Sequence, residues 1–174
     1  YHQVILAKIK SKTPSAVINI GGISNITYID KNNKVVGFDT GPGNCLINEW
    51  VNTKAKKEFD KDGIIAASGQ TDEKILKKFL SDPYFKKKFP KSLDVKYFNL
   101  QNLSKLSLED GCATLSMLTV KSICEALNNF KKKPNLVLFS GGGRKNKYII
   151  DNIKKKFTGS LKLIDDFNFN GDFI

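Results

Sequence analysis

The chain has 174 residues, of which 40% are hydrophobic, and it carries a formal net charge of +12 at pH 7. This length suits one domain with a hydrophobic core, and the apolar fraction is that of a globular rather than a disordered protein. No apolar run approaches the roughly 20 residues of a membrane-spanning helix. Nearly all the positive charge is lysine, with Arg144 the only arginine, which disfavours a nucleic-acid surface because phosphate and base recognition usually use the arginine fork.

The first part of the chain predicts a three-stranded antiparallel meander. Residues 1–9 alternate too loosely to distinguish a short helix from an extended segment, and both remain open. Beyond them, β-branched runs separated by turn residues predict consecutive hairpins. The expected strands are Ala16–Ile18 running into Asn19-Ile20, then Ile23–Ile29, and then Val35–Phe38.

Helices are predicted for the middle of the chain. Ile47, Trp50, Val51, Ala55 and Phe59 recur at helical spacing, and Trp50 is expected in the core. The segments that follow are expected to be an apolar loop at Ile64–Gly69, a helix from a Thr71 cap to Leu80, a short helical piece at Pro83–Pro90 and an irregular loop at Lys91–Leu106.

The last third predicts a helix–strand–helix–strand order. Ser107, with Asp110 three residues on, resembles a capping box and begins a long helix that should end near Asn129. The later elements are expected to be a buried parallel strand at Leu136–Phe139, a helix at about Asn146–Phe157 and a strand at Leu161–Ile164. This order predicts an α/β, ribonuclease-H-like domain with a five-stranded mixed sheet and helices on both faces.

Two glycine turns and one carboxylate fall at the ends of predicted strands. Gly21-Gly22 would allow positive φ and a close approach of backbone N–H groups to an anion, although a tight hairpin without ligand is the simpler reading. Gly141–Gly143 follow a buried strand, where open α/β sheets bind ligands. Asp39 ends a strand before a Gly-Pro-Gly loop and could act as a base or as a turn residue. Asn44 is expected to cap the next helix, with ligand binding as the alternative.

Five motifs follow one another along almost the whole chain: NIGGISNIT, GFDTGPGN, DGIIAASGQTD, DGCATLSMLTVKSI and LVLFSGGGRKN. In this order and at these separations they resemble the anhydro-N-acetylmuramic acid kinase family, and GFDTGPGN is the most specific of them. The resemblance implies an actin-like ATPase domain over residues 1–174, the second half of a two-domain sugar kinase, with a helical elaboration at about 60–106. The chain begins without methionine and lacks the family's GTSxDG phosphate loop, so a fragment is expected, with the missing N-terminal domain as a partner.

The resemblance also implies the reaction and the site. It implies an ATP- and Mg²⁺-dependent kinase that hydrolytically opens 1,6-anhydro-N-acetylmuramic acid and phosphorylates it to N-acetylmuramic acid 6-phosphate, in cytoplasmic peptidoglycan recycling. Asp39 would be the catalytic base. The residues implied to bind nucleotide are Gly21, Gly22, Asn25, Gly141, Gly142 and Gly143, and those implied to bind the sugar are Thr40, Gly41, Gly43 and Asn44.

The chain departs from the family pattern at two positions. Val95 stands where the family often has arginine, and Asn19 stands where superfamily members often have aspartate. No protein metal site is expected, because the three cysteines show no CxxC spacing and His2 is the only histidine; the thiols are expected to be buried in a reducing cytosol.

Two other classes of protein remain as alternatives. One is another sugar or acyl kinase of the same superfamily, which would keep the glycine loops but need no GFDTGPGN. The other is a non-catalytic module that binds nucleotide or nucleic acid, which steep salt dependence of DNA binding would reveal. A homodimer stays open as an oligomeric state.

Overall fold

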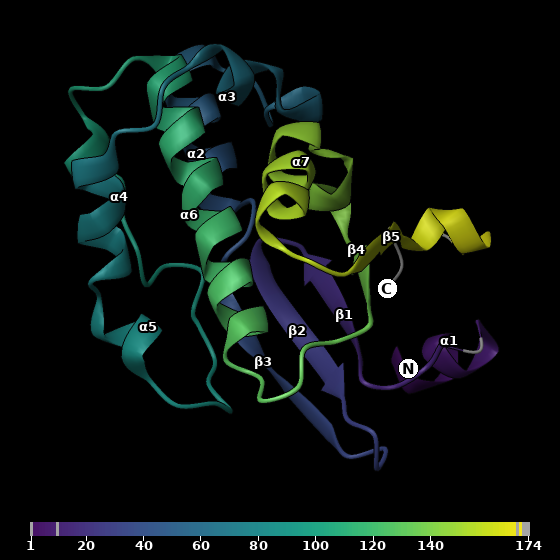
Figure 1. Cartoon of the computed structure of the whole chain (residues 1–174). Coiled ribbons are helices and arrows are strands. Elements are labelled where there is room, and N and C mark those ends of the chain that lie inside the picture. Colours follow the sequence, from purple (N-terminus) through teal and green to yellow (C-terminus); the bar gives the residue numbers. More distant parts are fainter. Residues whose placement is uncertain (1, 10, 170, 172–174) are drawn as a thin grey trace.

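Five strands form one mixed sheet in the order β3-β2-β1-β4-β5 (Figure 1). The computed structural model describes residues 2–9, 11–169 and 171. The β1–β2 and β2–β3 pairs are antiparallel, and the β1–β4 and β4–β5 pairs are parallel. The strands are β1 (Ser15–Ile20), β2 (Ile23–Ile29), β3 (Val35–Pro42), β4 (Leu136–Ser140) and β5 (Ser160–Leu163). The predicted five-stranded mixed sheet is confirmed, and β1 lies between the meander and the parallel strands.

Helix α6 (Leu108–Asn128) is the central helix on one face of the sheet. It begins as predicted, because the Ser107 hydroxyl accepts a hydrogen bond from the Asp110 N–H at 3.0 Å. Its neighbours are α2 (Cys45–Ala55), α3 (Ile64–Ser68), α4 (Glu73–Leu80) and α7 (Lys147–Lys156). Because these helices surround it, α6 is buried nearly all round instead of along one stripe.

Trp50 joins α2 to α6. Its indole lies on Gly111, where a Cβ would overlap the ring, and its Nε1 donates to the carbonyl of Leu108 at 2.9 Å. Trp50 therefore belongs to the core, as the sequence predicts, and it fixes the position of α2.

The other face of the sheet is covered by α1 (His2–Lys8) and the 3₁₀ turn η4 (Ile164–Phe167) (Figure 1). Residues 2–8 are thus helical, which settles the open alternative for them. A second apolar cluster fills this side, made up of Ile5, Leu6, Val17, Ile29, Leu138 and Ile164. Helices on both faces of the sheet are confirmed, and Ile164, predicted in the last strand, begins η4 instead.

The helix predicted through Phe59 is shorter than its apolar spacing suggests. It ends at Ala55 because Lys56 adopts a left-handed conformation, with φ of 56°. Phe59 therefore lies outside the helix and is 53% exposed.

Aspartate side chains organise the next two helices. The predicted apolar loop contains α3, because the Asp60 carboxylate accepts from the N–H groups of Ile65 and Ala66 at 2.8 and 3.0 Å. Asp72, and not Thr71, caps α4, accepting from two backbone N–H groups at 2.9 Å. Each oxygen of Asp60 accepts from one amide, whereas both amides of α4 donate to the same oxygen of Asp72, Oδ1.

The segment between α4 and α6 is mostly irregular, as predicted, and is packed by aromatic rings. Helix α5 (Pro83–Lys86) is shorter than the predicted piece, and η2 (Gln101–Leu103) is a single turn. Tyr84, Phe85 and Phe98 contact one another through their rings. The ammonium group of Lys91 lies 4.4 Å from the Tyr84 ring centroid.

Two of the three cysteines, Cys112 and Cys124, are buried as predicted. Burial raises the pKa of Cys112 to about 12 and that of Cys124 to about 11, whereas Cys45 at the start of α2 is only half-buried.

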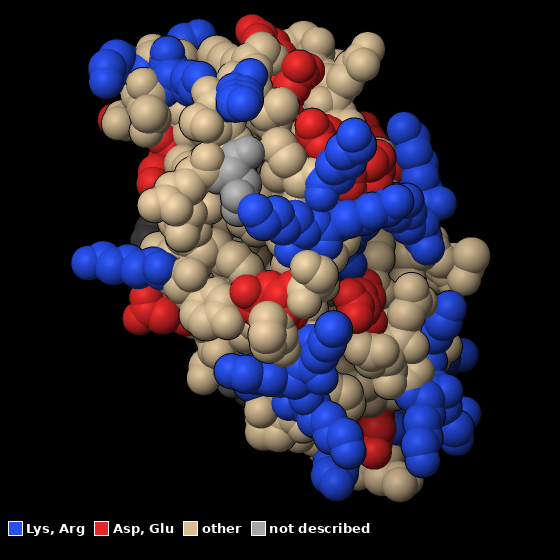
Figure 2. Space-filling view, turned by 90° about the vertical axis from the view of Figure 1, so that its left-hand side faces the viewer, with Lys and Arg blue, Asp and Glu red and all other residues tan. Residues whose placement is uncertain are grey.

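In the described part of the chain, no helix has the length and apolar character needed to cross a bilayer. Figure 2 shows one face on which lysines lie in several groups with acidic side chains between them.

Candidate functional site

Asp39 lies inside strand β3 and beside a bulge. The sequence placed it at a strand end, but β3 continues to Pro42. Asn25 faces Asp39 across the sheet, whereas Ser24 faces Gly41, so Thr40 is the extra residue of the bulge. The Thr40 hydroxyl turns inward and donates to the carbonyl of Ser24 at 3.1 Å.

Three hydrogen bonds from the chain in and after α5 hold Asp39 in place. The N–H of Asp39 donates to the carbonyl of Lys91 at 2.9 Å, and the N–H of Leu93 donates to Asp39 Oδ2 at 2.8 Å. The Tyr84 hydroxyl donates to the Asp39 carbonyl at 2.6 Å. Burial raises the pKa of Tyr84, and the negative charge of Asp39 raises it further, so this donor keeps its proton at neutral pH. The carboxylate is thereby oriented, with Oδ2 engaged.

An open hollow of about 580 Å³ lies beside Asp39. Its walls come from β2, β3 and the segment 90–92, and they include Asn25, Gly37 and Ser92. Asp39 Oδ1 has no hydrogen-bond partner among the described residues. The second carboxylate oxygen is thus available to a molecule in the hollow.

A row of polar side chains crosses four strands at the level of Asp39. Asp39 is in register with Asn25, Asn25 with Asn19, and Asn19 with Ser140. Residues in register share one face of a sheet, here the face that α1 covers further along. The buried Asn19 Oδ1 and Ser140 Oγ have no hydrogen-bond partner among the described residues. Buried oxygens without donors are costly unless something supplies them.

The turn Gly21-Gly22 and the loop 41–44 are bonded to each other. The N–H groups of Gly43 and Cys45 donate to the Gly22 carbonyl at 2.9 and 3.1 Å, and the N–H of Asn44 donates to the Gly21 carbonyl at 2.8 Å. A Cβ at Gly43 would overlap the Gly21 carbonyl oxygen, so this close approach requires glycine. From α6, the Thr119 hydroxyl contacts the carbonyls of Pro42 and Gly43 at 3.0 and 2.9 Å.

Gly21 and Gly22 do not use the positive φ that glycine allows, since neither has one. A Cβ on either would still meet no atom closer than 3.5 Å. Neither backbone strain nor tight packing therefore explains these glycines, and the turn presents bare backbone on its outer side.

The loop after β4 lines a second pocket, which has a volume of about 390 Å³. Gly141 has φ of 77°, in the left-handed region that favours glycine, and η3 (Gly142–Lys145) follows. A Cβ at Gly142 would meet no atom within 4 Å, so this residue borders open space. Asn44 lies in the same pocket, and its side chain donates to the Ile20 carbonyl at 3.3 Å; the expected side-chain cap of α2 is wrong.

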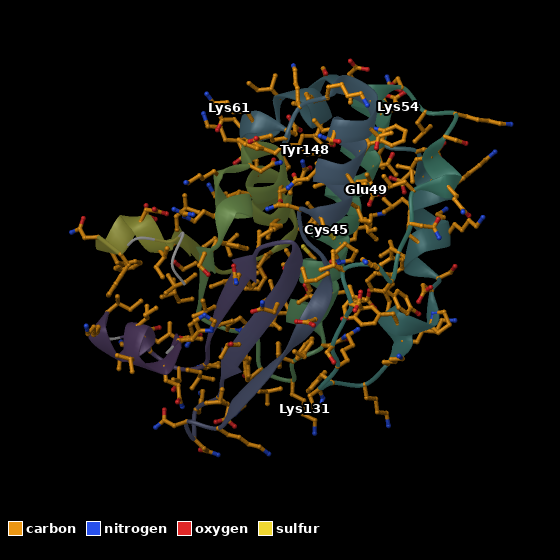
Figure 3. The ribbon with its side chains drawn as sticks, turned by 180° about the vertical axis from the view of Figure 1, so that it is seen from behind. Cys45, Glu49, Lys54, Lys61, Lys131 and Tyr148 are labelled. Carbon is orange, nitrogen blue, oxygen red and sulfur yellow. The ribbon has the colours of Figure 1, made fainter. Side chains whose placement is uncertain are left out.

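The outer wall of this pocket is the segment 59–62, with Phe59 exposed at its rim. Gly63, with φ of 75°, brings the segment against Asn146 at the start of α7. Figure 3 shows Lys61 and Tyr148 at the same end of the molecule, near α2. The position of this wall is thus fixed by its contact with α7 and by the Asp60 cap of α3.

The structure sorts the predicted site residues into two hollows. Asp39 and Asn25 line the open hollow, whereas Asn44, Gly142 and Gly143 line the pocket at the end of β4. The Gly21-Gly22 turn connects them, since it follows β1, precedes Asn25 and binds Asn44. Sequence reasoning missed Tyr84, Leu93 and Ser140, because backbone donors and lone hydroxyls carry no motif.

Two solved structures share this fold. The chain is similar to the ligand-bound xylulose kinase from Lactobacillus acidophilus, with a TM-score of 0.55, 15% identity and coverage of 92% of this chain and 37% of that one. It is also similar to the activator of the 2-hydroxyisocaproyl-CoA dehydratase from Clostridium difficile with bound ADPNP, with a TM-score of 0.51, 15% identity and coverage of 92% and 56%. The fold is therefore that of the actin-like ATPase and sugar kinase domains.

Sequence comparison narrows this class. The profile of the anhydro-N-acetylmuramic acid kinase family matches residues 1–174, and the chain belongs to that family. The anhydro-N-acetylmuramic acid kinases of Zymomonas mobilis and Pelagibacter ubique are 35% and 37% identical to it, over 99% and 100% of this chain. The chain spans about half the length of these relatives, 47% and 49% respectively.

Removing one hydroxyl should loosen the support of Asp39. We expect Tyr84→Phe to lower the free energy of unfolding by about 1 kcal/mol, since it deletes a buried hydrogen bond and leaves the Asp39 carbonyl without that donor. Urea denaturation of the chain measures this. The matched control is Tyr97→Phe, whose hydroxyl donates to Asp82 at an exposed site and whose loss should change little. Equal stability of both variants would contradict the support assigned to Tyr84.

Proposed function

We propose that this chain is the second domain, with its helical elaboration at about 60–106, of a two-domain kinase. The kinase opens 1,6-anhydro-N-acetylmuramic acid with water and phosphorylates it to N-acetylmuramic acid 6-phosphate. The observation that carries the proposal is the Asp39 carboxylate, fixed by the Leu93 N–H and open on its other oxygen to a hollow. Membership of the family supports the choice of reaction.

Asp39 is the general base of this proposal. Its free oxygen takes a proton from a water molecule as the water oxygen bonds to the anomeric carbon of the sugar. The bond between that carbon and O6 breaks, and O6 keeps the electron pair and bonds to the γ-phosphorus of ATP. The bond from that phosphorus to the oxygen bridging to the β-phosphate breaks, and ADP leaves with its electron pair. Proton transfer to a positioned carboxylate lowers the barrier of the attacking step. The hydrogen bonds from Leu93 and Tyr84 hold the base in place, so little reorientation is needed.

Asn25 and the loop 41–44 complete the sugar side of the site. Asn25 shares the hollow with Asp39 and can orient a hydroxyl or phosphate oxygen. Thr40 and Gly41 are buried, so we assign them the support of the loop and not direct contact with sugar. Gly43 likewise holds the turn in place through its contact with Gly21.

The pocket at the end of β4 is the proposed nucleoside site. Its volume of about 390 Å³ suits a nucleoside, and the open space over Gly142 lets a ligand reach the loop backbone. Gly21 and Gly22 would then face the phosphates, because the turn lies between this pocket and Asp39. Bound ATP with Mg²⁺ supplies the transferred phosphoryl group and neutralises its charge. Among the described residues no group of three or more His, Cys, Asp or Glu is placed to hold a metal ion, so we propose that Mg²⁺ arrives on the nucleotide.

The nucleoside site can be tested at Gly142. We expect Gly142→Val to leave the melting temperature nearly unchanged, because the new side chain meets no protein atom within 4 Å of its Cβ position, while the KM for ATP rises about tenfold or more. Steady-state kinetics of the complete protein that carries this chain provide the measurement. The control is Lys147→Ala, at an exposed position outside the pocket, which should leave that KM unchanged. A normal ATP affinity in Gly142→Val would place the nucleoside elsewhere.

A cytoplasmic role in recycling cell-wall sugars follows from the proposed substrate. Both the anhydro sugar and ATP would have to meet where ATP is present. We therefore propose the cytoplasm as the place of action.

A further inference from the structure

Arg144 follows directly after the glycine loop and is turned into the protein. It is the only arginine among the 29 basic residues of the chain, and it is 5% exposed. Its Nε donates to Asp165 Oδ2 at 2.6 Å and its Nη2 donates to Asp165 Oδ1 at 2.9 Å. Its Nη1 donates to the Gly141 carbonyl at 2.9 Å. One guanidinium therefore joins the glycine loop to η4.

Gly141 is held on both sides by the chain that follows β5. Its carbonyl accepts from Arg144, which Asp165 orients, and its N–H donates to the Gly171 carbonyl at 2.9 Å. The left-handed φ of 77° at Gly141 turns the chain so that Gly142 borders the pocket. Asp165, through Arg144, and Gly171 thus constrain the conformation of a loop more than twenty residues earlier in the sequence.

The chemistry of this contact needs arginine. A guanidinium presents several N–H donors in one plane, so it can bind both carboxylate oxygens and a carbonyl together, whereas a lysine ammonium cannot match that fork. A buried cation also requires a fixed partner to offset its desolvation. The Asp165 side chain is 46% exposed, so Asp165 can be substituted without placing a new side chain in the core.

We propose that Arg144 and Asp165 are positioning residues that hold the loop Gly141–Gly143 in the shape that receives the nucleoside. The inference rests on the proposed nucleotide site. Neither residue is assigned a contact with substrate; both act through Gly141. Loosening the pair should therefore weaken nucleotide binding and spare the sugar side, where Asp39 is held by a different part of the chain.

Asp165→Asn tests the proposal in the complete protein. The amide keeps the shape but loses the charge and one acceptor oxygen, so we expect the KM for ATP to rise about tenfold, with kcat and the KM for sugar within about twofold of wild type. Asp165→Glu, which restores the carboxylate, should recover most of the ATP affinity. Asp166→Asn is the matched neighbour: its carboxylate accepts from the Leu163 N–H and does not touch the glycine loop, so its ATP KM should stay normal.

A second measurement separates positioning from general destabilisation. Hydrogen exchange at the Gly141 N–H should become faster in Asp165→Asn and in Arg144→Lys, and it should be unchanged in Asp166→Asn. If Asp165→Asn does not fold, Arg144→Lys provides the same kinetic comparison. An unchanged ATP KM in these variants, or an equal rise in Asp166→Asn, would overturn the positioning role. A wild-type protein that fails to bind ATP would instead overturn the proposed function.

Discussion

Asp39→Asn should lower kcat by about two to four powers of ten in the complete protein while leaving ATP affinity unchanged. The amide oxygen of Asn can still accept the Leu93 N–H, so the local structure should survive. The other position of the side chain then carries an NH₂ group, which cannot take a proton from water. The loss therefore falls on the chemical step and not on the binding of either substrate.

Single-turnover kinetics with 1,6-anhydro-N-acetylmuramic acid and ATP would measure this loss, with ATP binding followed by calorimetry. Asp30→Asn is the matched control. Asp30 is also held by backbone amides, accepting from the N–H groups of Asn32 and Lys34 at 2.8 and 2.9 Å, but it lies in the turn before β3. Near-normal kcat in Asp39→Asn would show that Asp39 is only a structural residue.

Residues 1–174 alone should show no measurable kinase activity, although activity should appear when the other half of the proposed two-domain kinase is supplied. The hollow beside Asp39 and the pocket beside Gly142 are both open in this domain, so a nucleotide bound here would keep solvated phosphates. Correct placement of the two reactants can account for roughly 7–11 kcal/mol of a barrier when geometry is ideal. The chain spans about half of its relatives, and we propose that the other half supplies the facing wall.

The experiment compares the purified 174-residue chain, the complementary half and their mixture in a phosphate-transfer assay. Weak ATP binding by this chain without turnover is the expected result. The control for contaminating kinases is a mixture of the complementary half with a 174-residue chain that carries Asp39→Asn. Robust phosphorylation of the anhydro sugar by this chain alone would refute the need for a second wall.

Local patterns predicted the parts of the fold that depend on local physics. The β-branched runs of β1 and β2 and the buried run of β4 each specify a strand from a few residues. The Ser107 cap and the apolar repeat after it specify α6 in the same way. These signals were sufficient for the order of the elements along the chain, which is typical of a ribonuclease-H-like domain with a mixed sheet.

The supports of the site could not be predicted in this way. The bond from the Leu93 N–H to Asp39 comes from an irregular segment that aromatic packing places against β3. The Arg144–Asp165 pair joins residues that no periodicity relates. Phe59 fits the helical spacing of its predecessors and still lies outside the helix, because the backbone reverses at Lys56. Tertiary contacts decide these positions, and a sequence pattern does not record them.

The bonds between the Gly21-Gly22 turn, the loop 41–44 and Thr119 of α6 have a mechanical consequence. Most of these contacts join backbone atoms, and they connect the loop to the sheet and the central helix together. Such a loop cannot lift off as a lid without breaking several hydrogen bonds at once. We therefore expect any opening and closing around a substrate to be a hinge motion that carries this domain as a rigid body.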